Sequence, residues 1–244
     1  MSLRGIPKNV LVVEGDGGRA SRLALMINRF GYNVFVADND SVFHRIVNGV
    51  LPNIVLINLK MPLVDNKTYL EILREKKSLD LVKAVTYSEA GDGELLKDSL
   101  TKGADACTTI PVKPFALFEI LEKLTETRPR KAPRVSVILK VTVATKDGKG
   151  TGFATSFSEA GLFIRTSNPL PVDTLLKLAI ELPATNSPIT LDGKVIYIKK
   201  HSPEDPTEPG MAILFADMAG GMKKRMRSFV DSLISAELSP DIKI

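Results

Sequence analysis

The sequence predicts two domains in succession: an α/β domain with a doubly wound, parallel five-stranded sheet, and an all-β domain with a six-stranded antiparallel barrel and a C-terminal helix. Two patterns predict this order. The first half alternates short β-branched runs with amphipathic stretches, whereas the second half has strand-like runs separated by turn residues. A charged stretch with two prolines separates them. We therefore place the first domain at residues 1–124, a linker at 125–134 and the second domain at 135–244.

Five strand and helix pairs are expected in the first domain. The first apolar run is β-branched and ends in a cluster of glycines and acidic residues, which is typical of a buried strand. After it, Leu23, Met26, Ile27 and Phe30 recur at helical spacing, and Gly31 ends the pattern. The same alternation predicts strands at residues 9–13, 33–37, 54–59, 82–87 and 106–110, and helices at 19–30, 42–47, 68–75, 94–102 and 114–124.

Six strands are expected in the second domain, because turn pairs such as Asp-Gly and Asn-Pro separate its apolar runs. Short antiparallel strands at this spacing are typical of a small barrel. A last helix carries Met226, Phe229, Val230 and Leu233 on one stripe. The predicted strands are residues 135–146, 150–156, 161–166, 175–182, 189–199 and 211–217.

Composition excludes several classes of protein. Cys107 is the one cysteine of the 244 residues, so the chain forms no internal disulfide and no multi-thiolate zinc site. No apolar run reaches the ~18 residues of a membrane span, so a cytoplasmic protein is expected. The net charge of +5 comes without a concentrated basic face, which disfavours duplex nucleic acid as a partner. We find no Ser-His-Asp set, P-loop or HExxH motif, and therefore no catalytic residue.

The first half resembles the receiver domain of bacterial response regulators. Residues 52–66 are similar to the phosphoacceptor strand and loop of that family, and residues 103–105 (Gly-Ala-Asp) with 113–115 (Lys-Pro-Phe) are similar to its closing segment. Active members phosphorylate an aspartate at the end of the third strand, and this aspartate helps to hold Mg²⁺. Asn58 stands at that position. A neutral amide is neither a nucleophile toward phosphorus nor a good Mg²⁺ ligand, so we expect no phosphorylation and no bound metal.

The resemblance implies a degenerate phosphoacceptor pocket around Asn58. Glu14 stands where the family has two adjacent acids, which leaves Asp16 as the source of a second charge. Ser88 best matches the hydroxyl residue that reads the phosphoryl group, with Thr86 as an alternative. Lys113 matches the family's lysine, although the segment before it is about two residues longer than usual.

The second half carries a more specific pattern. Arg130 and Arg134 form an RxxxR motif directly before a predicted strand, and Ser156, Ser158 and Gly161 form an SxSxxG motif 22 residues after Arg134. This pair resembles the signature of the PilZ family, RxxxR followed by [D/N]xSxxG on a six-stranded barrel. The resemblance covers roughly residues 128–235. It implies that the ligand is cyclic di-GMP, with no other cofactor.

These residue types suit that ligand. Arginine offers a planar fork of donors for phosphate oxygens and for the O6 and N7 edge of guanine. Ser158 offers a hydroxyl, and Gly161 lets the backbone approach a ligand or turn with positive φ. Ser156 replaces the family's acidic or amide residue with a shorter, neutral acceptor. This change costs ~1 to 2 kcal/mol, or roughly five- to thirty-fold in affinity.

Together these features predict a bacterial signalling protein of the two-component type, not an enzyme. It would bind cyclic di-GMP and act through protein partners on either domain, and family resemblance suggests motility, adhesion or polysaccharide production as the process. The sequence leaves open whether the chain forms a homodimer. The alternative is a nucleotide-independent scaffold whose PilZ-like site is degenerate.

Overall fold

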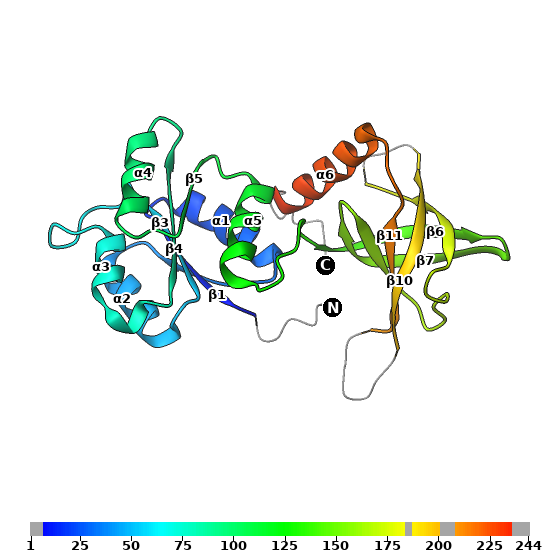
Figure 1. The fold of residues 1–244 in the computed structure, drawn as a ribbon, viewed down its shortest axis with the longest axis horizontal. Helices are drawn as coiled ribbons and strands as arrows, with labels where there is room; N and C mark the ends of the chain where they lie inside the picture. The colour runs from blue at the N-terminus through cyan, green and yellow to red at the C-terminus, as the bar shows by residue number, and fades with distance from the viewer. Residues whose placement is uncertain (1–6, 184–186, 201–207, 236–244) are drawn as a thin grey trace. The chain divides into compact units, whose positions relative to one another are not determined.

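The computed structural model describes residues 7–183, 187–200 and 208–235. The chain forms two compact units that divide between Lys131 and Ala132. Figure 1 shows their helices and strands. The fold class predicted from the sequence is confirmed for both: a parallel α/β sheet in the first unit and a closed antiparallel barrel with a last helix in the second. Within the described residues, the helices are too short or too polar to cross a membrane.

The first domain is a five-stranded parallel sheet in the order β2-β1-β3-β4-β5. Its strands are β1 (Asn9–Val13), β2 (Asn33–Ala37), β3 (Ile54–Asn58), β4 (Lys83–Glu89) and β5 (Ala106–Ile110). Its helices are α1 (Gly17–Arg29), α2 (Asp40–Val50), α3 (Tyr69–Glu75), α4 (Gly93–Thr101) and α5 (Pro114–Thr125), with the short 3-10 helix η1 (Lys77–Leu79).

Helices cover both faces of this sheet (Figure 1). On one face, Phe43 of α2 and Tyr69 of α3 pack edge to face at 4.9 Å over the central strands. On the other face, Phe30, which directly follows α1, packs its ring against that of Phe118 of α5, with the ring centroids 5.2 Å apart. Because β1, β3 and β4 are parallel neighbours, their carboxyl ends meet at one edge of the sheet. Residues that follow these strands are therefore brought together there.

The second domain is a closed barrel in the order β10-β11-β8-β7-β6-β9. Its strands are β6 (Val135–Thr145), β7 (Gly148–Ser158), β8 (Gly161–Arg165), β9 (Leu175–Ile180), β10 (Ile189–Lys199) and β11 (Gly210–Phe215). The last helix, α6 (Gly220–Ser235), buries Met226 and Val230. Phe229 of α6 packs its ring against Phe157 of β7 at 5.5 Å, so the stripe predicted from the sequence faces the barrel.

The β6–β7 hairpin is longer than the sequence pattern predicts. Strand β7 starts at Gly148 and runs to Ser158, whereas the apolar pattern covers only residues 150–156. Gly148 has φ +147, a conformation that other residues avoid, so the turn needs only two residues. At the far end, the pair between Ser158 and Gly161 extends β7 up to the next turn.

Candidate functional site

The carboxylate of Glu14, at the carboxyl end of β1, is the centre of a buried cluster of hydrogen bonds. Its side chain is 2% exposed. The Asn58 amide nitrogen donates to its two oxygens at 3.1 and 3.0 Å, and the Tyr87 hydroxyl donates to Oε2 at 3.0 Å. The backbone N–H of Asp16 donates to Oε1 at 2.9 Å, and Arg19 Nε lies 3.5 Å from Oε2. Protein donors therefore satisfy this buried charge from several sides.

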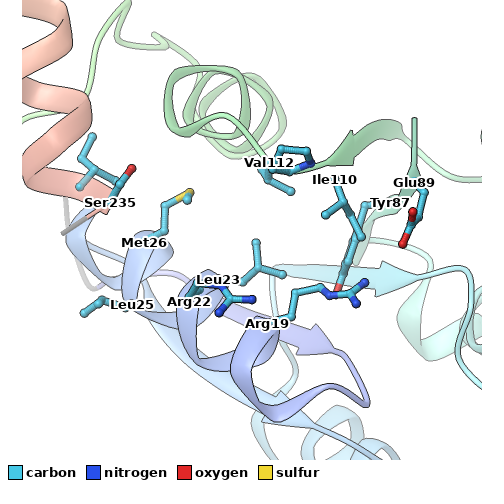
Figure 2. Close-up of a pocket in the computed structure, with 12 residues that line it drawn as sticks. Arg19, Arg22, Leu23, Leu25, Met26, Tyr87, Glu89, Ile110, Val112 and Ser235 are labelled. Carbon is cyan, nitrogen blue, oxygen red and sulfur yellow. The ribbon is translucent and has the colours of Figure 1, made fainter. Parts of the chain in front are cut away.

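Tyr87 remains a donor throughout the physiological pH range. Burial raises the pKa of Tyr87 well above that of an exposed tyrosine, and the neighbouring Glu14 carboxylate acts in the same direction. Figure 2 shows Arg19 on α1 and Tyr87 on β4 lining one side of a pocket, with Ile110 beside them. The sequence analysis missed both Tyr87 and Arg19. Their signal was weak: a tyrosine beside Ser88 and an arginine at the start of α1.

The residues of this pocket do not fit Mg²⁺. Asp16 Oδ1 accepts from Arg19 N–H at 2.6 Å and caps α1, and the second carboxylate expected from Asp16 stays a prediction. Asn58 turns its amide nitrogen toward Glu14, while its oxygen accepts from Lys60 N–H at 2.9 Å. In the described ranges no group of three His, Cys, Asp or Glu could hold a metal. The Asn58 amide and Arg19 thus occupy the side of Glu14 where a cation would bind.

The hydroxyl of Ser88 is held toward α4. Its Oγ donates to Asp92 Oδ2 at 2.5 Å, and Lys60 Nζ lies 3.0 Å from Asp92 Oδ1. The hydrogen bond from Ser88 lowers the pKa of Asp92, and the hydrogen bond from Lys60 acts in the same direction. This carboxylate therefore stays ionised. The alternative residue, Thr86, pairs with Ser99 of α4 at 2.7 Å.

Lys113 is the exposed N-cap residue of α5, three positions after β5 ends at Ile110. Ile110 pairs with Glu89 of β4. The role expected for Lys113 from the family resemblance stays a prediction.

In the second domain, strand pairing brings the two halves of the motif together. In the β6–β7 register Val135 is opposite Phe157 and Ser136 is opposite Ser156. Val135, the residue after Arg134, therefore lies opposite the residue between Ser156 and Ser158. Phe157 is fully buried, Ser158 is also buried, and Ser156 is partly buried. Arg134 is exposed.

Ser158 and Gly161 shape the turn from β7 to β8. The Ser158 hydroxyl donates to the Gly161 carbonyl at 3.1 Å and accepts from Ala160 N–H at 3.4 Å. Gly161 is not among the glycines with positive φ. A Cβ at this position would lie 2.4 Å from the Ile213 carbonyl oxygen of β11. The close approach of β11, rather than a left-handed turn, therefore requires this glycine.

Arg130 belongs to the first unit, whereas Arg134 belongs to the second. The Arg130 N–H donates to Oε2 of Glu122, a buried residue of α5, at 2.9 Å. The motif therefore spans the point at which the chain passes from one unit to the other. Sequence spacing could not show this.

The structure has two β-bulges and an aromatic side chain near Ser156 that the sequence did not predict. The β6–β7 register shifts between Ser136 and Leu139, and the β7–β8 register shifts between Ala154 and Ser156. Such bulges increase the local twist and turn a strand edge outward. Ser156 pairs with Phe163 of β8, whose ring centroid lies 6.1 Å from that of Tyr197.

A comparison with protein families matches residues 128–232 to the model described as PilZ domain. The PilZ resemblance found in the sequence is therefore confirmed, and this part of the chain is a PilZ domain.

Comparisons with known proteins find a relative and solved structures that are similar to part of this chain. The chain is 28% identical over 126 residues to Sporulation initiation phosphotransferase F of Bacillus subtilis (strain 168), covering 51% of this chain and 97% of that protein. A putative response regulator from Chloroflexus aurantiacus J-10-fl aligns with 18% identity and a TM-score of 0.45, over 49% of this chain and 98% of that one. The Bacillus subtilis inhibitor of motility MotI/DgrA aligns with 16% identity and a TM-score of 0.36, over 42% of this chain and 49% of that one.

We expect Asn58→Asp to make the first domain sensitive to Mg²⁺. The variant places a second carboxylate against the buried Glu14, so in EDTA the free energy of unfolding should fall by about 3 kcal/mol. About 10 mM MgCl₂ should restore part of this loss by binding both carboxylates. Thermal unfolding with and without Mg²⁺ measures both effects. Asn58→Ala is the control, which should be destabilised without recovery. A parent protein stabilised by Mg²⁺ would contradict this account of the pocket.

Gly161→Ala should destabilise the barrel by about 1 to 3 kcal/mol, because the new Cβ would press on the backbone of β11. Gly150→Ala in the same strand pair is the matched control, since a Cβ at that position would have nothing within 4 Å. Urea unfolding of the full chain compares the two. Equal free energies of unfolding for the two variants would show that β11 can move aside without loss of stability and that Gly161 has another role.

Proposed function

Because residues 128–232 form a PilZ domain after a receiver-like domain, we propose that this chain is a bacterial signalling protein that binds cyclic di-GMP and transmits the signal through protein contacts. The observation that supports the proposal most directly is the β6–β7 register, in which Val135, the residue after Arg134, lies opposite Phe157, between Ser156 and Ser158. We assign the ligand to Arg130, Arg134 and Ser156, with Ser158 and Gly161 shaping the turn beside them.

The chemistry of this surface fits a guanine-bearing dianion. Arg134 is exposed and can present its guanidinium to phosphate oxygens or to a guanine edge. Ser156 offers a neutral acceptor. Its cross-strand neighbour Phe163 forms an aromatic pair with Tyr197, which could contact a base.

The contacts in the first domain support a role without phosphotransfer. The amide of Asn58 replaces the nucleophilic carboxylate, and it donates to Glu14 instead of sharing a metal with it. We therefore propose that this domain is not phosphorylated and that it contacts protein partners. Our proposed mechanism is that cyclic di-GMP, held by Arg130 and Arg134, orders the linker at residues 125–134, which a partner then recognises.

The alternative is a scaffold that binds no nucleotide, and Ser156 in place of an acidic or amide residue favours it. We place the protein in the cytoplasm, where cyclic di-GMP is made and sensed, and leave dimerisation open. Motility, adhesion and polysaccharide production are candidate processes by family resemblance alone.

Calorimetric titration of the full chain with cyclic di-GMP should show saturable binding that the Arg130→Ala, Arg134→Ala double variant loses. The reason is that the variant lacks both guanidinium groups. Arg128→Ala, an exposed residue of the same linker outside the motif, should bind like the parent and serves as the control. At ~100 μM ligand a 10 μM site would stabilise the protein by ~1.4 kcal/mol. The absence of both heat and stabilisation in the parent would favour the scaffold.

Ser156→Asn should tighten cyclic di-GMP binding roughly five- to thirty-fold, because the amide oxygen reaches further and accepts from guanine more effectively. Ser136→Asn is the matched control: Ser136 is its cross-strand partner and is exposed, but it lies outside the motif. Titration of both variants measures the difference. Equal affinity of Ser156→Asn and the parent would remove Ser156 from the proposed base contact.

A further inference from the structure

Glu122 is a fully buried carboxylate that belongs neither to the cluster around Glu14 nor to the candidate ligand site of the second domain. It lies on α5 between Phe118 and the end of the helix, next to the equally buried Leu121. An ionisable group at a core position is costly unless hydrogen bonds satisfy it. A leucine would continue the apolar stripe of α5 without this cost. The position therefore calls for a reason beyond packing.

The contact of Glu122 points to the linker. Its Oε2 accepts from the N–H of Arg130, eight residues further along, at 2.9 Å. Its own carbonyl accepts at 2.9 Å from the N–H of Glu126, the C-cap residue of α5. A single residue thus contacts the helix cap through its backbone and the linker through its side chain. A carboxylate makes this a charge-assisted hydrogen bond, which is stronger than a neutral one.

Further hydrogen bonds fix the same end of α5 to the first domain. Lys8 Nζ donates to the Thr125 carbonyl and, at 3.1 Å, to Glu126 Oε1. The hydroxyls of Tyr32 and Thr125 lie 3.2 Å apart. The start of the linker is therefore tied to the residue before β1 and to the segment before β2, and the Glu122 contact extends this attachment to Arg130.

We propose that Glu122 is a positioning residue that fixes the backbone of Arg130 and so prepares this arginine for ligand binding. The proposal rests on the proposed function, since it names a residue that acts on the cyclic di-GMP site without touching the ligand. A binding residue that is already ordered loses less conformational freedom when the ligand arrives. Removal of the Glu122 acceptor should therefore weaken binding, even though both arginines remain.

Limited trypsin digestion of the full chain tests the attachment without ligand. Trypsin cuts after Arg130 and Lys131, and a fixed backbone resists it. Glu122→Leu should be cut there about fivefold faster than the parent. Glu122→Gln keeps an acceptor oxygen and should be cut at close to the parent's rate. Glu119→Leu, at an exposed position of the same helix, is the control.

Thermal unfolding separates positioning from folding. Glu122→Leu removes the acceptor of the Arg130 N–H, so its melting temperature should be lower than that of the parent. Faster cleavage of Glu122→Leu at a temperature well below both melting temperatures is the signature of a released linker. Cleavage at the parent's rate would overturn the proposal.

Titration with cyclic di-GMP completes the test. Glu122→Leu should bind about five- to tenfold more weakly than the parent, and Glu122→Gln should bind nearly as well as the parent. Unchanged affinity in Glu122→Leu, together with faster cleavage, would overturn the positioning role. Absence of binding in the parent would instead overturn the proposed function, and the cleavage rates alone would then decide whether Glu122 anchors Arg130.

Discussion

The antiparallel pairing of β6 with β7 is the interaction on which both the barrel and the candidate ligand site depend. These strands also pair with β9 and β8, so the hairpin is part of the barrel's closure. Side chains alternate between the faces of a strand, so a shift of one residue would turn Phe157 out of the core. Burial of Phe157 against Phe215 and Phe229 therefore selects the register that sets Ser136 opposite Ser156.

Buried carboxylates in the first domain follow one rule: each is satisfied by donors of the protein itself. Glu14 accepts from Asn58, Tyr87 and a backbone N–H, and Glu122 accepts from the linker. An unpaired charge in such positions would destabilise the fold strongly, whereas a paired one fixes the groups around it. The amide at position 58 thus does more than remove a nucleophile, because it supplies the donor that Glu14 needs.

The sequence predicted the helices and strands well, but it predicted the contacts between side chains less well. Strands such as 9–13 and the stripe of α6 follow from periodicity, which is a local property. The motif spacing also predicted correctly that Asn58 ends β3. The sequence analysis did not identify Asp16 as the residue that caps α1. The need for Gly161 comes from a carbonyl on β11, some fifty residues later, which no local pattern reveals. The partners of Glu14 and Glu122 depend in the same way on the completed fold.

On the proposed function, these contacts determine where a ligand can exert control. A ligand shifts an equilibrium only by the difference in its affinity for two states. Around Glu14, protein donors already occupy the place of a cation, and Asn58 offers no nucleophile for a phosphoryl group. In the linker, Arg134 is exposed while the backbone of Arg130 is held by Glu122. A dianion that engages both arginines gains contacts that exist only when the linker is ordered. On the proposed function, control by cyclic di-GMP would enter through the linker, and the first domain would provide the fixed support for its N-terminal end.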